Sequence, residues 1–327
     1  MSKSHAQTTA EPTYSFQEND HGPTEAVQMY LGDREGEVSP QTQDKRRWHL
    51  RKFTKWCREN GVEHTRDLDN PALFRYKQCR GKKIKKVTLK SELSTLKNFL
   101  EVMERAGVVA NGLADAVDPS AIKLSRDERA KTERVSPKAA DDILSDLGKF
   151  KPYSRDHVVF MLLWESGMRT GALLSLDLDD WHSRKQSLTV EHRPDDGTRL
   201  KNGEKGTREI MVSDRLAEVL NGYVEHHRLD RADDYGRDPL ITTTQGRPCT
   251  VTIRTTVYDL TEDCDHVDGK LGPHAIRKGS IGRHLSDGWL IQDVAERCDV
   301  TEQKLRQHYD TRPENEKMLD RRDKYDL

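Results

Sequence analysis

The chain has 327 residues, with 55 Lys and Arg against 56 Asp and Glu, a formal net charge of −1 and 33% hydrophobic residues. This length accommodates two domains of roughly 100–200 residues each, and no apolar run is long enough to span a membrane. Five cysteines without a Cys-x-x-Cys pair argue against a disulfide framework and, with no signal peptide in view, predict a soluble cytoplasmic protein.

The first third of the chain reads as a polar tail followed by short helices. Residues 1–22 lack hydrophobic periodicity, which predicts disorder. Capping residues and glycines then delimit four helices, and the fourth carries an apolar stripe at helical spacing. We therefore expect an all-α domain over 23–118 and a charged linker over 119–137. The stripe consists of Leu89, Leu93, Leu96, Leu100 and Met103.

A cluster of five lysines without an acid marks the start of the fourth helix. Cations there oppose the helix dipole, so contact with DNA phosphates explains the cluster better than chance does. A solvated loop remains the alternative, and the near-zero net charge of the chain argues mildly against nucleic-acid binding. The cluster comprises Lys82, Lys83, Lys85, Lys86 and Lys90.

The second domain is expected over 138–312, with a tail over 313–327. Its pattern predicts helices interrupted by two strands, at 188–190 and 210–212, which a polar Gly-containing arm joins. Further helices are expected to begin near five positions. The sequence thus predicts a mainly α fold with one small antiparallel β-sheet. These helix starts are Ser213, Thr250, Pro273, Leu290 and Thr301.

Three basic side chains point to a phosphate site in this domain. Pro273 sets a helix start, and His274 and Arg277, three residues apart, share one face near the amides that favour an anion. Arg169 follows a predicted helix end at Gly167, between two apolar helices, where it would need an anion. The plainer alternatives are a solvated helix-end pair and a structural ion pair of Arg169.

Three further residues complete the candidate set. Lys201 lies on the polar arm, where it could protonate a leaving oxygen, and Lys205 competes with it for that role. Tyr309 follows Arg277 by 32 residues and offers a hydroxyl nucleophile that needs activation. Taken singly, each of them reads better as a solvated lysine or a packed aromatic. Arg169 could equally pair with Asp177 or Asp179.

A metal centre is not expected from the sequence. Cys264 and His266 lie two residues apart, with His274 further on, but no second close Cys/His pair accompanies them. We therefore expect neither a metal nor a cofactor.

Taken together, Arg169, Lys201, His274, Arg277 and Tyr309 resemble the tyrosine recombinase (phage integrase, Xer-like) family, with archaeal integrase-like members most similar. The resemblance spans 23–312. It implies an N-terminal core-binding (SAM-like) domain and a catalytic domain that together clamp double-stranded DNA. It also implies a homotetramer on two DNA sites and catalysis without a cofactor.

The resemblance assigns the chemistry as well. Tyr309 would attack a phosphorus to form a 3′-phosphotyrosyl link. Arg169, Arg277 and His274 would neutralise the phosphate, and Lys201 would act as the general acid. The expected biological outcome is DNA recombination or integration.

Two positions depart from the family pattern. Ala172 replaces an acidic residue, and Val300 replaces a histidine or tryptophan that would donate to the phosphate. By analogy with oxyanion donors, the second loss costs roughly 10²–10³ in rate. Two alternatives therefore stay open: a decayed DNA-binding regulatory protein and a type IB topoisomerase-like relaxase. A plain helical scaffold would leave the ordered set of residues to chance.

Overall fold

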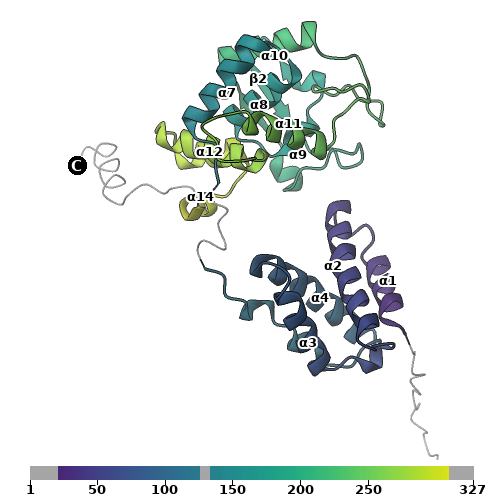
Figure 1. The fold of residues 1–327 in the computed structure, drawn as a ribbon. Helices are drawn as coiled ribbons and strands as arrows, with labels where there is room; N and C mark the ends of the chain where they lie inside the picture. Colours follow the sequence, from purple (N-terminus) through teal and green to yellow (C-terminus); the bar gives the residue numbers. More distant parts are fainter. Residues whose placement is uncertain (1–20, 126–132, 309–327) are drawn as a thin grey trace, which may run out of the picture. The chain divides into compact units, whose positions relative to one another are not determined.

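The computed structural model describes residues 21–125 and 133–308 (Figure 1). The backbone divides into two compact units, Met1–Thr132 (the N-terminal unit) and Glu133–Leu327 (the C-terminal unit). Both units are mainly helical, and the strands of the described ranges form one small antiparallel sheet. The mainly α fold class predicted from the sequence is confirmed. Within the described residues, no helix has the length and apolarity needed to cross a membrane.

The N-terminal unit is built from helices whose starts the sequence marks. Ser39 and Asp69 cap α2 and α3 by accepting hydrogen bonds from the N–H groups three residues on. Aromatic rings at edge-to-face angles join α1 to α4 and α2 to α3. The helices are α1 (Pro23–Asp33), α2 (Pro40–Glu59), α3 (Asn70–Gly81), α4 (Lys86–Arg105) and α5 (Leu113–Ala116).

One carboxylate lies inside this first core. Glu92 of α4 is 1% exposed, and it accepts hydrogen bonds from the Tyr76 hydroxyl at 2.5 Å and from Arg80 Nε at 2.6 Å. A buried carboxylate without partners would destabilise the fold strongly, so these contacts hold α3 to α4.

The C-terminal unit is organised around α8 (Arg155–Ser166). Residues on every side of this helix are buried, and α7, α10, α11 and α12 pack around it. The side chain of Ser154 caps its start. The surrounding helices are α7 (Pro137–Phe150), α9 (Thr170–Ser175), α10 (Asp214–His226), α11 (Thr250–Glu262), α12 (Pro273–Ser286), α13 (Ile291–Cys298) and α14 (Glu302–His308).

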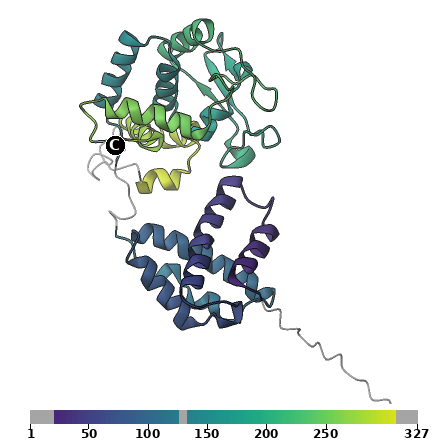
Figure 2. The ribbon, with the colours of Figure 1, turned by 45° about the vertical axis from the view of Figure 1, so that its right-hand side comes forward.

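A three-stranded sheet lies toward the right of this unit in Figure 2. Strand β2 (Ser187–Val190) is central, with β1 (Trp181–His182) and β3 (Arg208–Met211) antiparallel on either side. In the register, Leu188 faces both Trp181 and Ile210, so apolar side chains meet on the buried face. The sequence predicted β2 and β3, whereas β1 is too short to show a period.

Described residues at both ends of the expected linker over 119–137 pack into a core. Ile122 packs into the core of the N-terminal unit, and Val135 packs into that of the C-terminal unit. The Val135 N–H also donates to the Ala275 carbonyl at 3.2 Å. Helix α7 begins at Pro137, with Ser136 as its cap.

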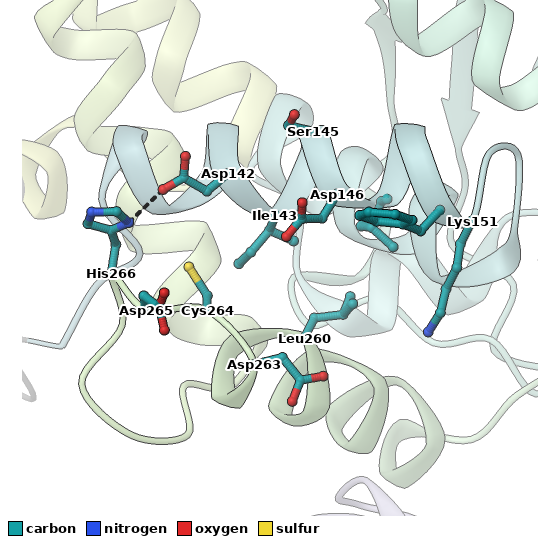
Figure 3. Close-up of a pocket in the computed structure, with 12 residues that line it drawn as sticks. Asp142, Ile143, Ser145, Asp146, Lys151, Leu260, Asp263, Cys264, Asp265 and His266 are labelled. Carbon is teal, nitrogen blue, oxygen red and sulfur yellow. Dashed lines mark ion pairs between the residues drawn. The ribbon is translucent and has the colours of Figure 1, made fainter.

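The loop between α11 and α12 folds against α7 (Figure 3). There His266 Nδ1 lies 2.6 Å from Asp142 Oδ2. The Thr261 hydroxyl is hydrogen-bonded at 3.0 Å to both the N–H and the carbonyl of Leu271. These contacts set where α12, which carries His274 and Arg277, begins.

Candidate active site

The turn that carries Arg169 can form only with a glycine at its centre. Gly167 ends α8 with φ 61°, in the left-handed region. A Cβ at this position would lie 2.7 Å from Cys298 Sγ, closer than real contacts allow, and a tight 3.0 Å from Ser280 Oγ. The tight turn therefore brings α13 against the end of α8 and projects Arg169 from the start of α9.

Arg277 joins the ends of two helices. It is 4% exposed, and its Nη1 donates to the carbonyls of Gly167 at 2.5 Å and Cys298 at 2.6 Å. Carbonyls at helix ends lack partners within their own helix, so a guanidinium is a fitting donor. Arg277 thus fixes the turn before Arg169 to the last residue of α13.

Arg169 pairs with a carboxylate that sequence reasoning did not select. Its Nη1 contacts Asp299 Oδ2, across 130 positions of sequence. Asp299 follows α13 with φ 51°, a conformation that Asp tolerates better than most residues. The plainer alternative, a structural ion pair of Arg169, is therefore present, but its partner is Asp299. Asp177, one of the two partners named from the sequence, pairs with Arg237 and Arg247.

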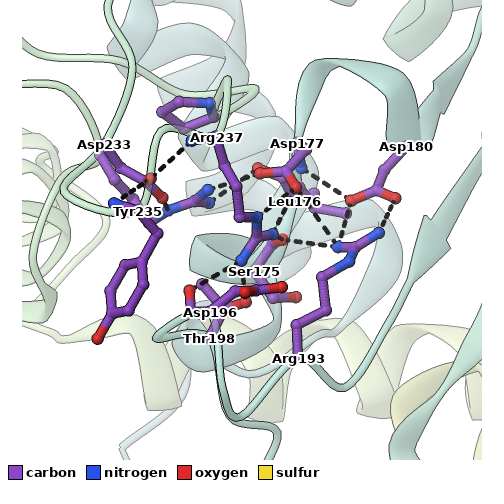
Figure 4. Close-up of polar contacts among 12 residues, drawn as sticks. Ser175, Leu176, Asp177, Asp180, Arg193, Asp196, Thr198, Asp233, Tyr235 and Arg237 are labelled. Carbon is purple, nitrogen blue, oxygen red and sulfur yellow. Dashed lines mark hydrogen bonds and ion pairs between the residues drawn. The ribbon is translucent and has the colours of Figure 1, made fainter.

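Those partners form a network of part-buried ion pairs (Figure 4). Asp177 contacts Arg237, lies 2.5 Å from Arg247 Nη2 and lies 3.7 Å from Arg193 Nη1. Arg193 also binds Asp180 at 2.7 Å. Each charge in the network contacts an opposite charge. Removing one of them would leave its partner desolvated and unpaired, which would destabilise the fold.

The network also holds the arm between β2 and β3. Arg237 Nη1 donates to Thr198 Oγ1 at 2.7 Å and to the Asp196 carbonyl at 3.0 Å. Further along, the Leu200 N–H donates to His192 Nδ1 at 3.0 Å. The next two residues reach the candidate site, because Asn202 Nδ2 donates to Asp299 Oδ1 at 2.7 Å beside the exposed Lys201.

His274 is an exposed residue in the first turn of α12. Partial burial lowers the pKa of His274, and the positive charges of Lys278, Arg277, Lys201 and Arg169 lower it further. A neutral imidazole at neutral pH can donate one hydrogen bond to an anion. Three separate chain segments thus bring positive charge to one ring.

Arg208 is a second residue that the sequence interpretation missed. It begins β3 and donates from Nε to the Arg297 carbonyl at 2.9 Å and from Nη1 to the Gly206 carbonyl at 2.8 Å. Its Nη2 is buried without a hydrogen-bond partner. Burial lowers the pKa of Arg208 to about 10, and the Asp299 carboxylate offsets part of that effect. The only sequence signal that could have singled out Arg208 is its position at the start of a strand, after a glycine-containing arm.

Residues 133–314, more than half of the chain, match the Phage integrase family. The chain belongs to this family. Its members are tyrosine recombinases, which break and rejoin DNA, so the resemblance noted in the sequence is confirmed.

Relatives and solved structures agree with the assignment. The tyrosine recombinase XerC of Pseudomonas syringae pv. syringae (strain B728a) is 24% identical over 289 residues, covering 84% of this chain and 88% of the relative. The Tn1549 transposon integrase in complex with transposon right end DNA gives a TM-score of 0.69 at 12% identity, covering 94% of this chain and 100% of the other. A lambda integrase dimer bound to a COC′ core site gives 0.67 at 12% identity, covering 89% and 78%. At such identities, these structures support the fold.

The predicted nucleophile, Tyr309, and the predicted departure from the family pattern, Val300, both belong to the C-terminal end of the candidate site. Tyr309 lies outside the described residues and directly follows α14. Val300, which stands in place of a phosphate donor, packs against a small apolar cluster that includes Ile281 and Leu305. Val300 therefore serves packing between α12 and α14.

The lysine cluster belongs to the N-terminal unit. Lys82, Lys83, Lys85 and Lys86 are exposed between α3 and the first turn of α4. Lys90 is half-buried, and its Nζ lies 3.4 Å from the Ile122 carbonyl. Lys90 thus has an acceptor within the N-terminal unit.

Proposed function

We propose that this chain is a site-specific recombinase that cleaves and rejoins double-stranded DNA with Tyr309 as its nucleophile. The observation that carries the proposal is the meeting of three segments of the C-terminal unit at Asp299. Its carboxylate contacts Arg169 and accepts a hydrogen bond from Asn202, the neighbour of Lys201. Arg277 donates to the carbonyl of Cys298, the residue before Asp299. Without an anion this concentration of positive charge is unfavourable. A phosphodiester, whose charge grows toward the transition state, is the partner that suits it.

In the proposed reaction, the Tyr309 oxygen attacks the phosphorus and the bond from phosphorus to the 5′-oxygen breaks. Lys201 supplies the proton that the leaving 5′-hydroxyl needs, and we prefer it to Lys205 because its charge acts on His274. Arg169, Arg277 and the neutral His274 stabilise the pentacoordinate phosphate. Attack by a 5′-hydroxyl of the partner duplex reverses the step, so the reaction requires no cofactor.

Asp299 would compete with DNA for Arg169 in the proposed site. Its carboxylate contacts Arg169. A scissile phosphate presents the same kind of oxygen acceptors and would take the place of the carboxylate on the guanidinium. DNA binding and the release of Arg169 would therefore occur together.

The assembly that we propose follows the DNA complexes of the structural relatives. The core-binding domain (23–118) and the catalytic domain (138–312) would hold one duplex, with Lys82, Lys83, Lys85 and Lys86 on its phosphates. Lys90, which the sequence grouped with them, donates to the Ile122 carbonyl instead. Four protomers would act on two DNA sites in the cytoplasm, and the tail 313–327 would contact a neighbouring subunit. The lambda integrase relative is a dimer on its core site.

Covalent trapping on nicked DNA tests the proposal. The full chain is incubated with a library of nicked duplexes that have a randomised centre, and the mixture is then denatured. Sequencing the DNA that stays bound to the protein identifies the preferred site. We expect a denaturant-resistant protein–DNA species from the wild type and its complete loss in Tyr309→Phe. Arg277→Lys should lower the yield about 10²-fold or more, since one bidentate donor to the phosphate is lost.

Tyr325→Phe is the matched control, because it removes the same hydroxyl 16 residues later and should leave trapping intact. Tight, salt-sensitive DNA binding without any covalent species would instead support the decayed regulatory protein. Relaxation of supercoiled plasmid without trapped sequence preference would support the topoisomerase-like alternative.

A further inference from the structure

A cavity with an acidic lining, unlike the arginine-rich candidate active site, opens between α7 and the loop that follows α11 (Figure 3). Its volume is about 440 Å³, and carboxylates dominate its charged lining. Lys151 is the one lysine or arginine among the lining residues. A pocket of this charge favours a cation and disfavours DNA. The carboxylates are Asp142, Asp146, Asp263 and Asp265.

Three donors of different kinds converge at one end of this cavity. An oxygen of Asp142, the sulfur of Cys264 and a ring nitrogen of His266 all lie within 4.8 Å of one another. Asp142 comes from α7, whereas Cys264 and His266 lie on the loop. The Val267 N–H donates to the Cys264 carbonyl at 3.0 Å, and this turn keeps the two loop donors together.

The contact between Asp142 and His266 does not satisfy the carboxylate. His266 Nδ1 lies 2.6 Å from Asp142 Oδ2, yet this buried oxygen accepts no hydrogen bond of acceptable geometry. A buried carboxylate oxygen without a hydrogen bond is costly. A metal ion that takes one ligand atom from each residue would satisfy both atoms.

We propose that Asp142, Cys264 and His266 bind a divalent transition-metal ion of the zinc class. Thiolate, imidazole and carboxylate are the ligands that Zn²⁺ takes in proteins, and Mg²⁺ or Ca²⁺ would not select sulfur. The sequence offers only the Cys264–His266 pair, and the fold adds Asp142 from 122 positions earlier. The Cys264 thiol gives up its proton to solvent when the metal–sulfur bond forms.

The spacing of the donors suits this ion after small side-chain rotations. Ligands about 2.0–2.3 Å from a tetrahedral Zn²⁺ are roughly 3.3–3.6 Å apart. Separations of up to 4.8 Å would close by about 1 Å, and the 2.6 Å contact between His266 and Asp142 would open by somewhat less. The exposed His266 and the half-buried Cys264 can rotate to do this. The fourth position is left to Asp265, next in sequence to both loop donors, or to water.

Metal binding here would fasten the loop before α12 to α7. The loop ends at the helix that carries His274 and Arg277, so the ion would order the entry to the candidate active site without touching DNA. This inference is independent of the cleavage chemistry.

Cobalt substitution tests the site directly. The full chain is stripped with a chelator under reducing conditions and titrated with Co²⁺ alone. We expect one equivalent to bind with a thiolate-to-cobalt charge-transfer band. This band should be lost in Cys264→Ser and should persist in Cys249→Ser, which removes an exposed cysteine elsewhere. His266→Gln and Asp142→Asn should each weaken binding at least tenfold.

A stability readout separates the metal site from a simple ion pair. Zn²⁺ at about 100 times its dissociation constant should raise the melting temperature of the wild type by roughly 5–10 °C and leave Cys264→Ser unchanged. Absence of the charge-transfer band, or a band that survives in Cys264→Ser, would overturn the proposal. An equal Zn²⁺ shift in wild type and Cys264→Ser would overturn it as well. The His266–Asp142 contact would then be only an ion pair.

Discussion

Asp299 is the residue whose charge most directly opposes phosphate binding. It contacts Arg169 and accepts from Asn202, so its carboxylate stands where we expect the scissile phosphate. Asp299→Asn keeps a residue that tolerates φ 51° and removes the charge. We expect duplex DNA to bind roughly 3–10-fold more tightly, measured by fluorescence anisotropy at fixed salt. Asp293→Asn, an exposed acid on the same helix, is the control, and weaker binding by Asp299→Asn would show that the carboxylate positions the site instead.

At the scale of elements, α12 is joined to the end of α8 through a histidine that is buried in its neutral form. His284 Nε2 lies 2.9 Å from the Glu165 carbonyl, and the residue is 2% exposed. Burial, with the charges of Arg283 and Arg297, lowers its pKa to about 4. The unfolded value is about 6.5, so the stabilisation is complete above that pH and declines as pH falls toward 4.

Urea unfolding at pH 7 and pH 4.5 measures this contribution. We expect the wild type to lose about 2–3 kcal/mol through His284 between these two values. His284→Gln keeps a donor for the Glu165 carbonyl and should lose that part of the pH dependence. Identical pH dependence in the two proteins would contradict the assignment.

The elements themselves could largely be predicted from the sequence, because their signals are local. The leucine stripe of α4 and the caps at Ser39, Asp69 and Ser154 act within a few residues, and the helices lie where they indicate. Helix α7 was not predicted, since its charged face resembles the preceding linker. Contacts across long separations were also missed. The pairs Arg169–Asp299 and Asp142–His266 depend on how helices pack, which no local pattern encodes.

At the scale of the whole molecule, the lysine cluster should govern how DNA affinity depends on salt. Each phosphate contact adds about 0.9 to the slope of log affinity against log salt. Replacing three exposed lysines with glutamine should therefore flatten the slope by about 2.7, whatever the DNA sequence. Titration of labelled duplex across a salt series measures it. The three are Lys82, Lys83 and Lys85.

A second triple variant controls for the loss of net charge. It replaces exposed lysines on and after α7, and its slope should equal that of the wild type. Equal flattening in both variants would mean that affinity follows total charge and not this cluster. Lys90→Gln should have little effect, because Lys90 faces the Ile122 carbonyl. The control lysines are Lys138, Lys149 and Lys151.

Arg277 serves two purposes, and this affects how related sequences should be interpreted. Because its guanidinium joins the carbonyl ends of α8 and α13, a descendant that had stopped cutting DNA would still need it to fold. Retention of this arginine is therefore poor proof of catalytic competence in a relative. His274 sits at an accessible helix start and has no comparable fastening role. Among diverging homologues, its loss should come first and should mark the lineages that bind DNA without breaking it.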